Sequence, residues 1–206
     1  MENYKDIYRI YQDHLIKLQQ AAVDFGLDHR PSLERIARKL GMLGADSSLI
    51  FDEEEDMPVF MDGLIYETER HQQPTVSAYF LTHPPGDDID RVLSQGMRKA
   101  RFGLYRVLWT QPERGETRLQ SLAGGTVDTN LINIHFSESA ITGLIVAMRI
   151  LPLPEFSICS SVFFPFAAGK ELRMQREWHK KTGIDRYAHM YKLSQKESVR
   201  ALTKYL

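Results

Sequence analysis

The sequence lacks most of the features by which protein classes are recognised from composition. Among its 206 residues there is one cysteine, Cys159, so an internal disulfide and a cysteine-rich zinc motif are both excluded. Its longest apolar runs, such as 144–148, are far shorter than the roughly 20 residues that a membrane-spanning helix requires. The first residues are polar, unlike those of a signal peptide. We therefore expect a cytoplasmic protein that does not bind membranes.

The sequence also lacks the short motifs of common enzymes. It contains no nucleophile elbow, P-loop or dinucleotide fingerprint, and its seven histidines are scattered without the spacing of a helical zinc motif. The neighbours of Cys159 are apolar or small, which indicates a buried thiol rather than a reactive one. We therefore predict a non-enzymatic protein with no catalytic residues, no metal site and no cofactor. An enzyme whose site is assembled only in space is the weaker alternative.

Charge is distributed unevenly along the chain, although the net charge is only −1. Residues 51–70 contain eight acids and one base, whereas residues 170–206 contain ten bases and four acids. These segments therefore carry −7 and +6, and they attract each other within one chain or between two chains. Our first hypothesis is a binding or assembly module whose partner is another protein or a second copy of the chain. Its interaction surface consists of Asp52, Glu53, Glu54, Glu55 and Asp56.

The alternative hypothesis is a single-stranded nucleic-acid-binding protein that uses the predicted barrel and the basic tail. Basic residues lie beside aromatic ones near residue 100 and at the start of the tail. Such combinations neutralise phosphates and stack on bases. The residues concerned are Arg98, Lys99, Arg101, Arg106, Arg173, Arg176, Trp178, Lys180 and Lys181. The competing interpretation is that the aromatic residues belong to the core and that the bases only solubilise the surface.

Before residue 100 and in the tail, the apolar spacing predicts helices. Seven apolar residues from Tyr4 to Phe25 recur at intervals of four and three, and Gly26 ends this first helix. Further helices are expected at 31–42, 57–70 and 88–99, and 74–82 fits a short helix slightly better than an extended segment. Asp56 is the expected N-cap of the helix that follows it, and Asp87 and Asp88 are expected to cap the helix that runs to about Lys99. Gly183 is expected to split the tail into two helices.

Between residues 101 and 166, short strand-like segments alternate with turns. The segments are Arg101–Thr110, Glu116–Leu122, Thr126–Phe136, Leu144–Leu151 and Glu155–Phe164. Their connections are too short for crossover helices, so most pairings should be antiparallel. We therefore predict an α+β protein in which a helical N-terminal half (1–100) packs on a small, mostly antiparallel five-stranded barrel or curled sheet (101–166), followed by a basic helical tail (167–206). The three regions are short enough to form one integrated domain.

Several short sequence segments resemble those of a protein family. They are Phe51-Asp52, Met57-Pro58-Val59, Met61-Asp62, His83-Pro84-Pro85, Ala100-Arg101-Phe102, Arg106-Val107 and Leu151-Pro152-Leu153. Because these segments occur in the same order, the chain is similar over residues 31–166 to a family of bacterial proteins of unknown function. The resemblance implies a bacterial cytoplasmic origin, and it implies that the acidic segment and the β region belong to one unit. It implies no activity, cofactor or catalytic residue.

Overall fold

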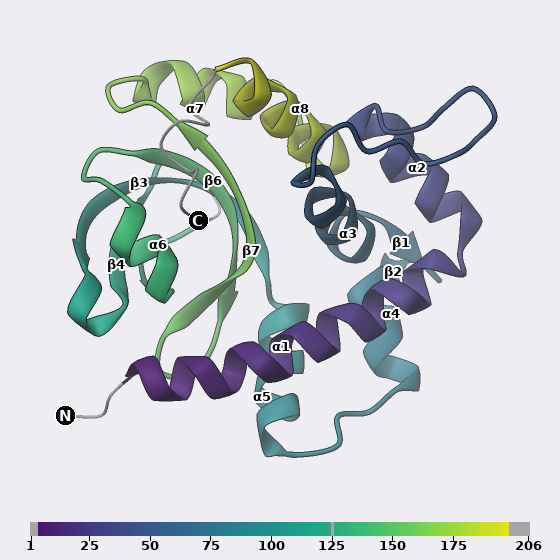
Figure 1. The fold of residues 1–206 in the computed structure, drawn as a ribbon, viewed down its shortest axis with the longest axis horizontal. Coiled ribbons are helices and arrows are strands. Elements are labelled where there is room, and N and C mark those ends of the chain that lie inside the picture. Colours follow the sequence, from purple (N-terminus) through teal and green to yellow (C-terminus); the bar gives the residue numbers. More distant parts are fainter. Residues whose placement is uncertain (1–3, 125, 198–206) are drawn as a thin grey trace.

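A helical half, a small barrel and a helical tail follow one another along the chain, as the α+β prediction requires. The computed structural model describes residues 4–124 and 126–197 (Figure 1). Its helices are α1 (Tyr4–Leu27), α2 (Arg30–Leu40), α3 (Asp56–Tyr66), α4 (Thr75–Thr82), α5 (Asp88–Arg98), α6 (Ile134–Ser139), α7 (Glu171–His179) and α8 (Gly183–Lys196). Its strands are β1 (Glu69–Arg70), β2 (Gln73–Pro74), β3 (Arg101–Gln111), β4 (Glu116–Ser121), β5 (Thr129–Ile132), β6 (Ile145–Pro152) and β7 (Ser157–Phe166), and a 3-10 turn, η1 (Pro112–Arg114), joins β3 to β4.

Strands β3 to β7 form the predicted small barrel, in the order β3-β4-β5-β7-β6 with β6 pairing back to β3. The pairings are antiparallel except that of β5 with β7, where one residue pair, Leu131 with Ser157, joins the seam. Apolar side chains fill the interior, among them Tyr105, Val146 and Met148. Strand β6 is buried on both faces because its other side chains point toward the helices.

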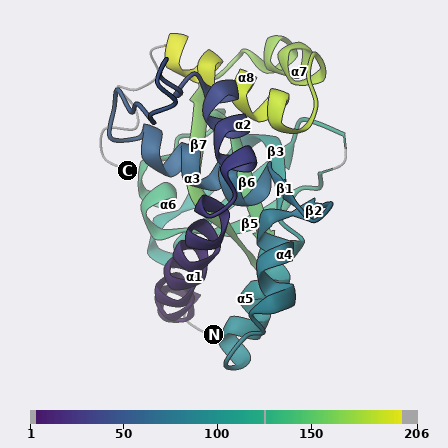
Figure 2. The same ribbon diagram turned by 90° about the vertical axis from the view of Figure 1, so that its right-hand side faces the viewer.

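The N-terminal helices cover one side of the barrel, and α7 and α8 lie at the rim that is uppermost in Figure 1 (Figures 1 and 2). Helix α3 is central, since it contacts α1, α2, α4 and β7. Tyr8, Leu15 and Ala22 are buried, as the stripe along α1 predicts. One hydrophobic cluster contains Leu15 of α1, Leu151 of β6 and Tyr187 of α8, so all three regions contribute to a common core. None of the helices in the described residues carries an apolar stretch long enough to cross a bilayer.

The expected strand Thr126–Phe136 is largely wrong. Only β5, at Thr129–Ile132, is extended there, and helix α6 follows at once. The reason is Asn133, whose side-chain Oδ1 accepts a hydrogen bond of 2.8 Å from the backbone N–H of Phe136 and so caps a new helix. The alternation of apolar residues that suggested a strand therefore belongs to a strand end and a single helical turn. His135, expected on a strand, is exposed on α6.

Of the expected helix caps, Asp87 is confirmed, whereas Asp56 is wrong and Asp88 is the first residue of α5. Asp87 caps α5, because its Oδ1 accepts a hydrogen bond of 2.8 Å from the N–H of Asp90. Asp56 is instead the first residue of α3. Its carboxylate accepts hydrogen bonds from the N–H groups of Asp52, at 3.0 Å, and Glu53, at 3.1 Å, and therefore holds the preceding loop.

Gly63 provides a test of how closely α3 packs in this fold. A Cβ added there would lie 2.6 Å from Cδ1 of Ile36 and 3.2 Å from Cε1 of Tyr187, so the side chains that α2 and α8 pack against it would have to shift. We expect Gly63→Ala to lower the free energy of unfolding by about 1–3 kcal/mol, since overpacking outweighs the gain in helix propensity. Gly124→Ala is the control, because a Cβ there meets nothing within 4 Å. Equal stability of the two variants in urea unfolding would contradict the packing described here.

Candidate functional site

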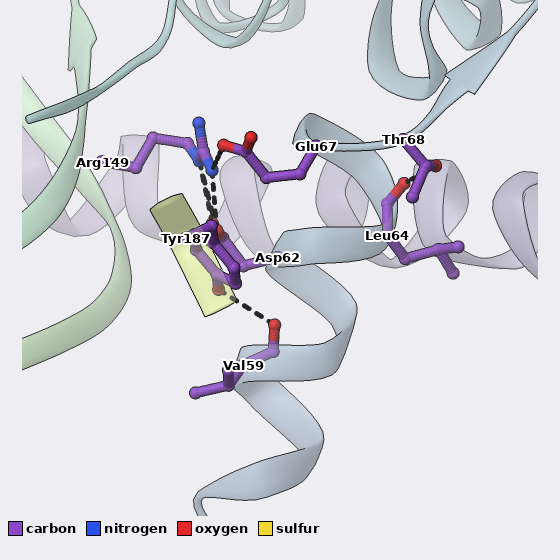
Figure 3. Close-up of polar contacts among 7 residues, drawn as sticks. All are labelled: Val59, Asp62, Leu64, Glu67, Thr68, Arg149 and Tyr187. Carbon is purple, nitrogen blue, oxygen red and sulfur yellow. Dashed lines mark hydrogen bonds and ion pairs between the residues drawn. The ribbon is translucent and has the colours of Figure 1, made fainter. Parts of the chain in front are cut away.

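The described core contains a buried ion cluster formed by Arg149, Asp62 and Glu67 (Figure 3). Arg149, on β6, is 3% exposed. Its Nε lies 3.3 Å and 3.2 Å from the two carboxylate oxygens of Asp62, and its Nη2 donates to Asp62 Oδ2 at 3.1 Å. The same Nη2 donates to Oε1 of Glu67 at 2.7 Å. One guanidinium group thus holds two carboxylates from α3 and the residue that follows it.

The alternation of side chains along β6 places Arg149 on the face toward this helix. Met148 pairs with Phe163 of β7, but the next pair along is Ile150 with Cys159. Strand β7 therefore contains extra residues opposite Arg149, as in a β-bulge. The side chain of Arg149 points to the helices, whereas those of Met148 and Ile150 belong to the cluster inside the barrel.

Hydrogen bonds from α8 and from Thr68, just past the helix end, hold α3, which supplies Asp62 and leads into Glu67 (Figure 3). The hydroxyl of Tyr187, on α8, donates to the carbonyl of Val59 on α3 at 2.9 Å. Near the other end of α3, the hydroxyl of Thr68 donates to the carbonyl of Leu64 at 2.6 Å. Glu67 is the C-cap residue of α3, so the end of this helix positions its carboxylate.

Aromatic rings and carboxylates keep the guanidinium group charged in spite of its burial. The Cζ of Arg149 lies 4.4 Å from the ring centroid of Tyr66 and 5.7 Å from that of Phe102. Burial alone would lower the pKa of Arg149, but the charges of Asp62 and Glu67 outweigh it and hold the pKa above its ordinary value. Burial raises the pKa of the Tyr66 hydroxyl, and the nearby Asp62 raises it further, so this group stays neutral.

A pocket of about 230 Å³ opens beside the ion cluster. Arginines from four elements or their ends line it: Arg98 ends α5, Arg101 begins β3, Arg149 lies on β6 and Arg186 lies on α8. Glu67 also lines the pocket, as do the ring of Phe102 and the first residue of α8. With Asp62 behind Arg149, the four arginines face two carboxylates, and the site carries an excess of two positive charges.

Arg186 lines the pocket with part of its guanidinium group already hydrogen-bonded. Its Nε donates to the carbonyl oxygens of Trp178, at 3.0 Å, and Lys181, at 2.8 Å, at the end of α7. Its Cζ lies 4.5 Å from the ring of Trp178. In the part of the chain that the structure describes, its two terminal nitrogens make no hydrogen bond. Burial lowers the pKa of Arg186, while the charge of Glu67 opposes this.

Arg98 and Arg101 present uncommitted guanidinium groups. The Cζ of Arg98 lies 5.6 Å from the ring of Phe80, and Arg101 is exposed. Within residues 4–124 and 126–197, neither side chain has a carboxylate partner. Together with Arg186 they give the pocket three cations that still have N–H donors to offer, which is the usual composition of a site for a carboxylate or a phosphate.

The structure brings together only part of the residue set proposed for nucleic-acid binding. Arg98 and Arg101 share the pocket, and Lys99 is exposed between them as the C-cap of α5. Arg106 instead donates to Gln120 at 2.6 Å, within the barrel wall. Binding of nucleic acid by these residues stays a prediction.

The tail residues of the same set lie elsewhere. Arg176 and Lys180 line a shallow depression on α7, Arg173 pairs with Glu197 at 2.7 Å, and the carbonyl of Lys181 accepts from Arg186. Trp178 is 2% exposed, so its ring belongs to the core, as the competing interpretation had it. It is not placed to stack on a base.

The acidic segment is divided between surface and interior. Asp52, Glu53, Glu54 and Glu55 are exposed in the loop before α3. Asp56 is 4% exposed, and it accepts a short hydrogen bond from the hydroxyl of Tyr191 on α8. Its inclusion in a surface for partners is therefore wrong, because a buried carboxylate that links α3 to α8 is not available to another chain.

Reasoning from the sequence named Arg98 and Arg101 but missed the ion cluster and Arg186, although one signal was present. Arg149 is the one charged residue between Leu144 and Leu153, and a charge within an apolar strand needs a buried partner. Asp62 lies among residues expected to face inward on their helix. It was counted only toward the acidic segment, and Arg186 only toward the basic tail.

The ion cluster predicts a large asymmetry between two losses of negative charge. In Asp62→Asn, Arg149 loses its main charge partner while staying buried, so we expect the free energy of unfolding to fall by about 3 kcal/mol. The control Glu69→Gln removes an exposed carboxylate from β1 and should change it by less than about 0.5 kcal/mol. Urea unfolding at neutral pH measures both. A loss in Asp62→Asn as small as in the control would show that the cluster does not depend on Asp62.

Comparison with known proteins adds a family but no activity. A family model described as "Family of unknown function (DUF7986)" matches residues 1–204. No curated protein and no solved structure matches the chain. The match includes the stretch 31–166 on which the resemblance rested and extends it toward both ends, while a bacterial origin stays a prediction. The chain therefore belongs to the DUF7986 family, whose function is unknown.

Proposed function

We propose that this protein is a non-enzymatic binding module that takes a small anionic group into the arginine-lined pocket beside Arg149. The observation that carries the proposal is the convergence of Arg98, Arg101 and Arg186 on one pocket with free N–H donors. Arginine side chains repel one another, so three of them around one small volume are most stable when an anion lies among them. The buried ion cluster supplies a rigid wall against which such an anion would be held.

The rest of the lining supports a small organic anion. The first residue of α8, Gly183, lines the pocket, and the N-terminus of a helix favours negative charge through its unpaired N–H groups. The ring of Phe102 and the side chains of Val76 and Met97 offer apolar surface for carbon atoms. A volume of about 230 Å³ suits a small ligand, since drug-sized ligands occupy pockets of roughly 300–1,000 Å³.

Binding of simple anions tests this proposal directly. Isothermal titration calorimetry with phenyl phosphate and with benzoate should show saturable binding of at least one of them to the full chain. Arg101→Ala and Arg98→Ala should each weaken it about tenfold, because each removes a charge-assisted hydrogen bond. Lys99→Ala is the control, since it removes an equal charge between them without removing a residue that lines the pocket.

Two results would count against an anion pocket. One is the absence of binding of both probes at millimolar concentration. The other is equal weakening by all three variants, which would indicate a diffuse electrostatic effect. If single-stranded RNA were retarded at low salt, and the retardation depended on Arg173 and Arg176 rather than on Arg101, the nucleic-acid hypothesis would be favoured instead.

Assembly through opposite charges is a second candidate, and the exposure of Asp52 to Glu55 favours it. The basic segment has fewer charges free than its composition suggests, because Lys170 and Arg173 both pair with Glu197 within the tail. If charge drives assembly, the mass in solution should correspond to an oligomer at low salt and to a monomer at high salt. The variant Asp52→Asn/Glu54→Gln/Glu55→Gln should be monomeric at both. A wild-type protein that is monomeric at low salt would rule this candidate out.

A further inference from the structure

Within the cluster, Glu67 holds a different place from Asp62. The side chain of Asp62 is 4% exposed, approaches Arg149 from within the core and contacts both its Nε and Nη2. The side chain of Glu67 is 12% exposed, lines the pocket and contacts Nη2 alone, at 2.7 Å. Glu67 is therefore the carboxylate of the cluster that both contacts Arg149 and lines the pocket.

The charge of Arg149 does not require this second carboxylate. Asp62 already balances it, and Glu67 turns the cluster into a group of net charge −1. That negative charge lies where Arg98, Arg101 and Arg186 line the same pocket, and it also acts on the pKa of Arg186. A carboxylate in this position has the surroundings that an anionic ligand would have.

Building on the proposed function, we infer that Glu67 occupies the anion position on Arg149, and that a phosphate monoester dianion displaces it. A monoanion would exchange one negative charge for an equal one and gain little from the exchange. A dianion gains, because it replaces the single charge of Glu67 by two and so reduces the excess of two positive charges that the site carries with Glu67 in place. Phosphate monoesters carry about −1.5 to −2 at neutral pH and offer three acceptor oxygens to the four arginines.

The displacement needs only a side-chain movement. The backbone N–H of Glu67 is fixed to the carbonyl of Gly63 at 2.9 Å, and Thr68 is anchored to Leu64. Rotation about the side-chain bonds of Glu67 can swing its carboxylate toward solvent while α3 stays in place. Asp62 remains on Arg149 throughout, so the buried charge is never without a partner.

Selectivity between two probes of the same shape tests the charge requirement in the wild-type chain. Phenyl phosphate is a dianion above its second pKa of about 6, whereas phenyl sulfate is a monoanion. We expect phenyl phosphate to bind at least about tenfold more tightly at pH 7.5. The preference should vanish near pH 5, where the phosphate carries a single charge and the arginines are unchanged. Equal affinities at pH 7.5 would overturn the inference.

The variant Glu67→Gln tests the displacement itself. Its amide can still accept from Arg149 but carries no charge, so both probes should bind more tightly, by about tenfold for phenyl phosphate and by more for phenyl sulfate. The control Glu69→Gln removes the same charge from an exposed site outside the pocket and should change either affinity less than about twofold. If Glu67→Gln did not fold, Glu67→Asp, which withdraws the carboxylate by one methylene, should also bind phenyl phosphate more tightly.

The outcomes separate this inference from the proposed function. If the wild-type chain bound neither probe nor benzoate, the proposed function would fail and the inference with it. If the wild-type chain bound the probes with equal affinity, or Glu67→Gln bound phenyl phosphate no more tightly than wild type, the pocket would still bind anions. Glu67 would then be a structural partner of Arg149 rather than a competitor of the ligand.

Discussion

A guanidinium group cannot be buried as a neutral species, because its pKa is too high for it to give up its proton in a folded protein. Arg149 therefore requires negative charge wherever the barrel places it, and the cost of leaving it unpaired is several kcal/mol. Asp62 satisfies this requirement, and in doing so it fixes α3 against β6. Helix α3, which also contacts α1, α2, α4 and β7, is thereby tied to the barrel wall.

Such a cluster is a poor source of stability, since well-packed apolar residues of similar volume often do as well or better. Its effect here is one of position. Through Arg149 it places charge on the barrel wall beside the junction where α5 leads into β3 and where α8 begins. Arg98, Arg101 and Arg186 line that junction. The second carboxylate, Glu67, exceeds what Arg149 needs, and this excess is what connects a structural ion pair to the proposed binding site.

Much of the fold followed from local patterns, whereas the site did not. The stripe along α1, the cap at Asp87 and the turns between strands depend on residues close together in sequence, so apolar periodicity and turn chemistry predicted them. The strand expected up to Phe136 was wrong because a side chain, Asn133, started a helix within it. The ion cluster joins Arg149 to Asp62 across 87 positions, and no local pattern encodes such a pairing. Counting charge per segment grouped Asp62 and Glu67 with the acids of 52–56 and so gave no sign that they are partners of Arg149.

The central claim is that Glu67, which contacts Nη2 of Arg149 and lines the pocket, holds a position that an anion can take. A crystal structure of the full chain with phenyl phosphate tests it most directly. The account predicts the phosphate group within hydrogen-bond distance of Nη2 of Arg149, with Asp62 in place and the carboxylate of Glu67 rotated away. A phosphate bound elsewhere, or bound in the pocket while Glu67 still contacts Arg149, would contradict it.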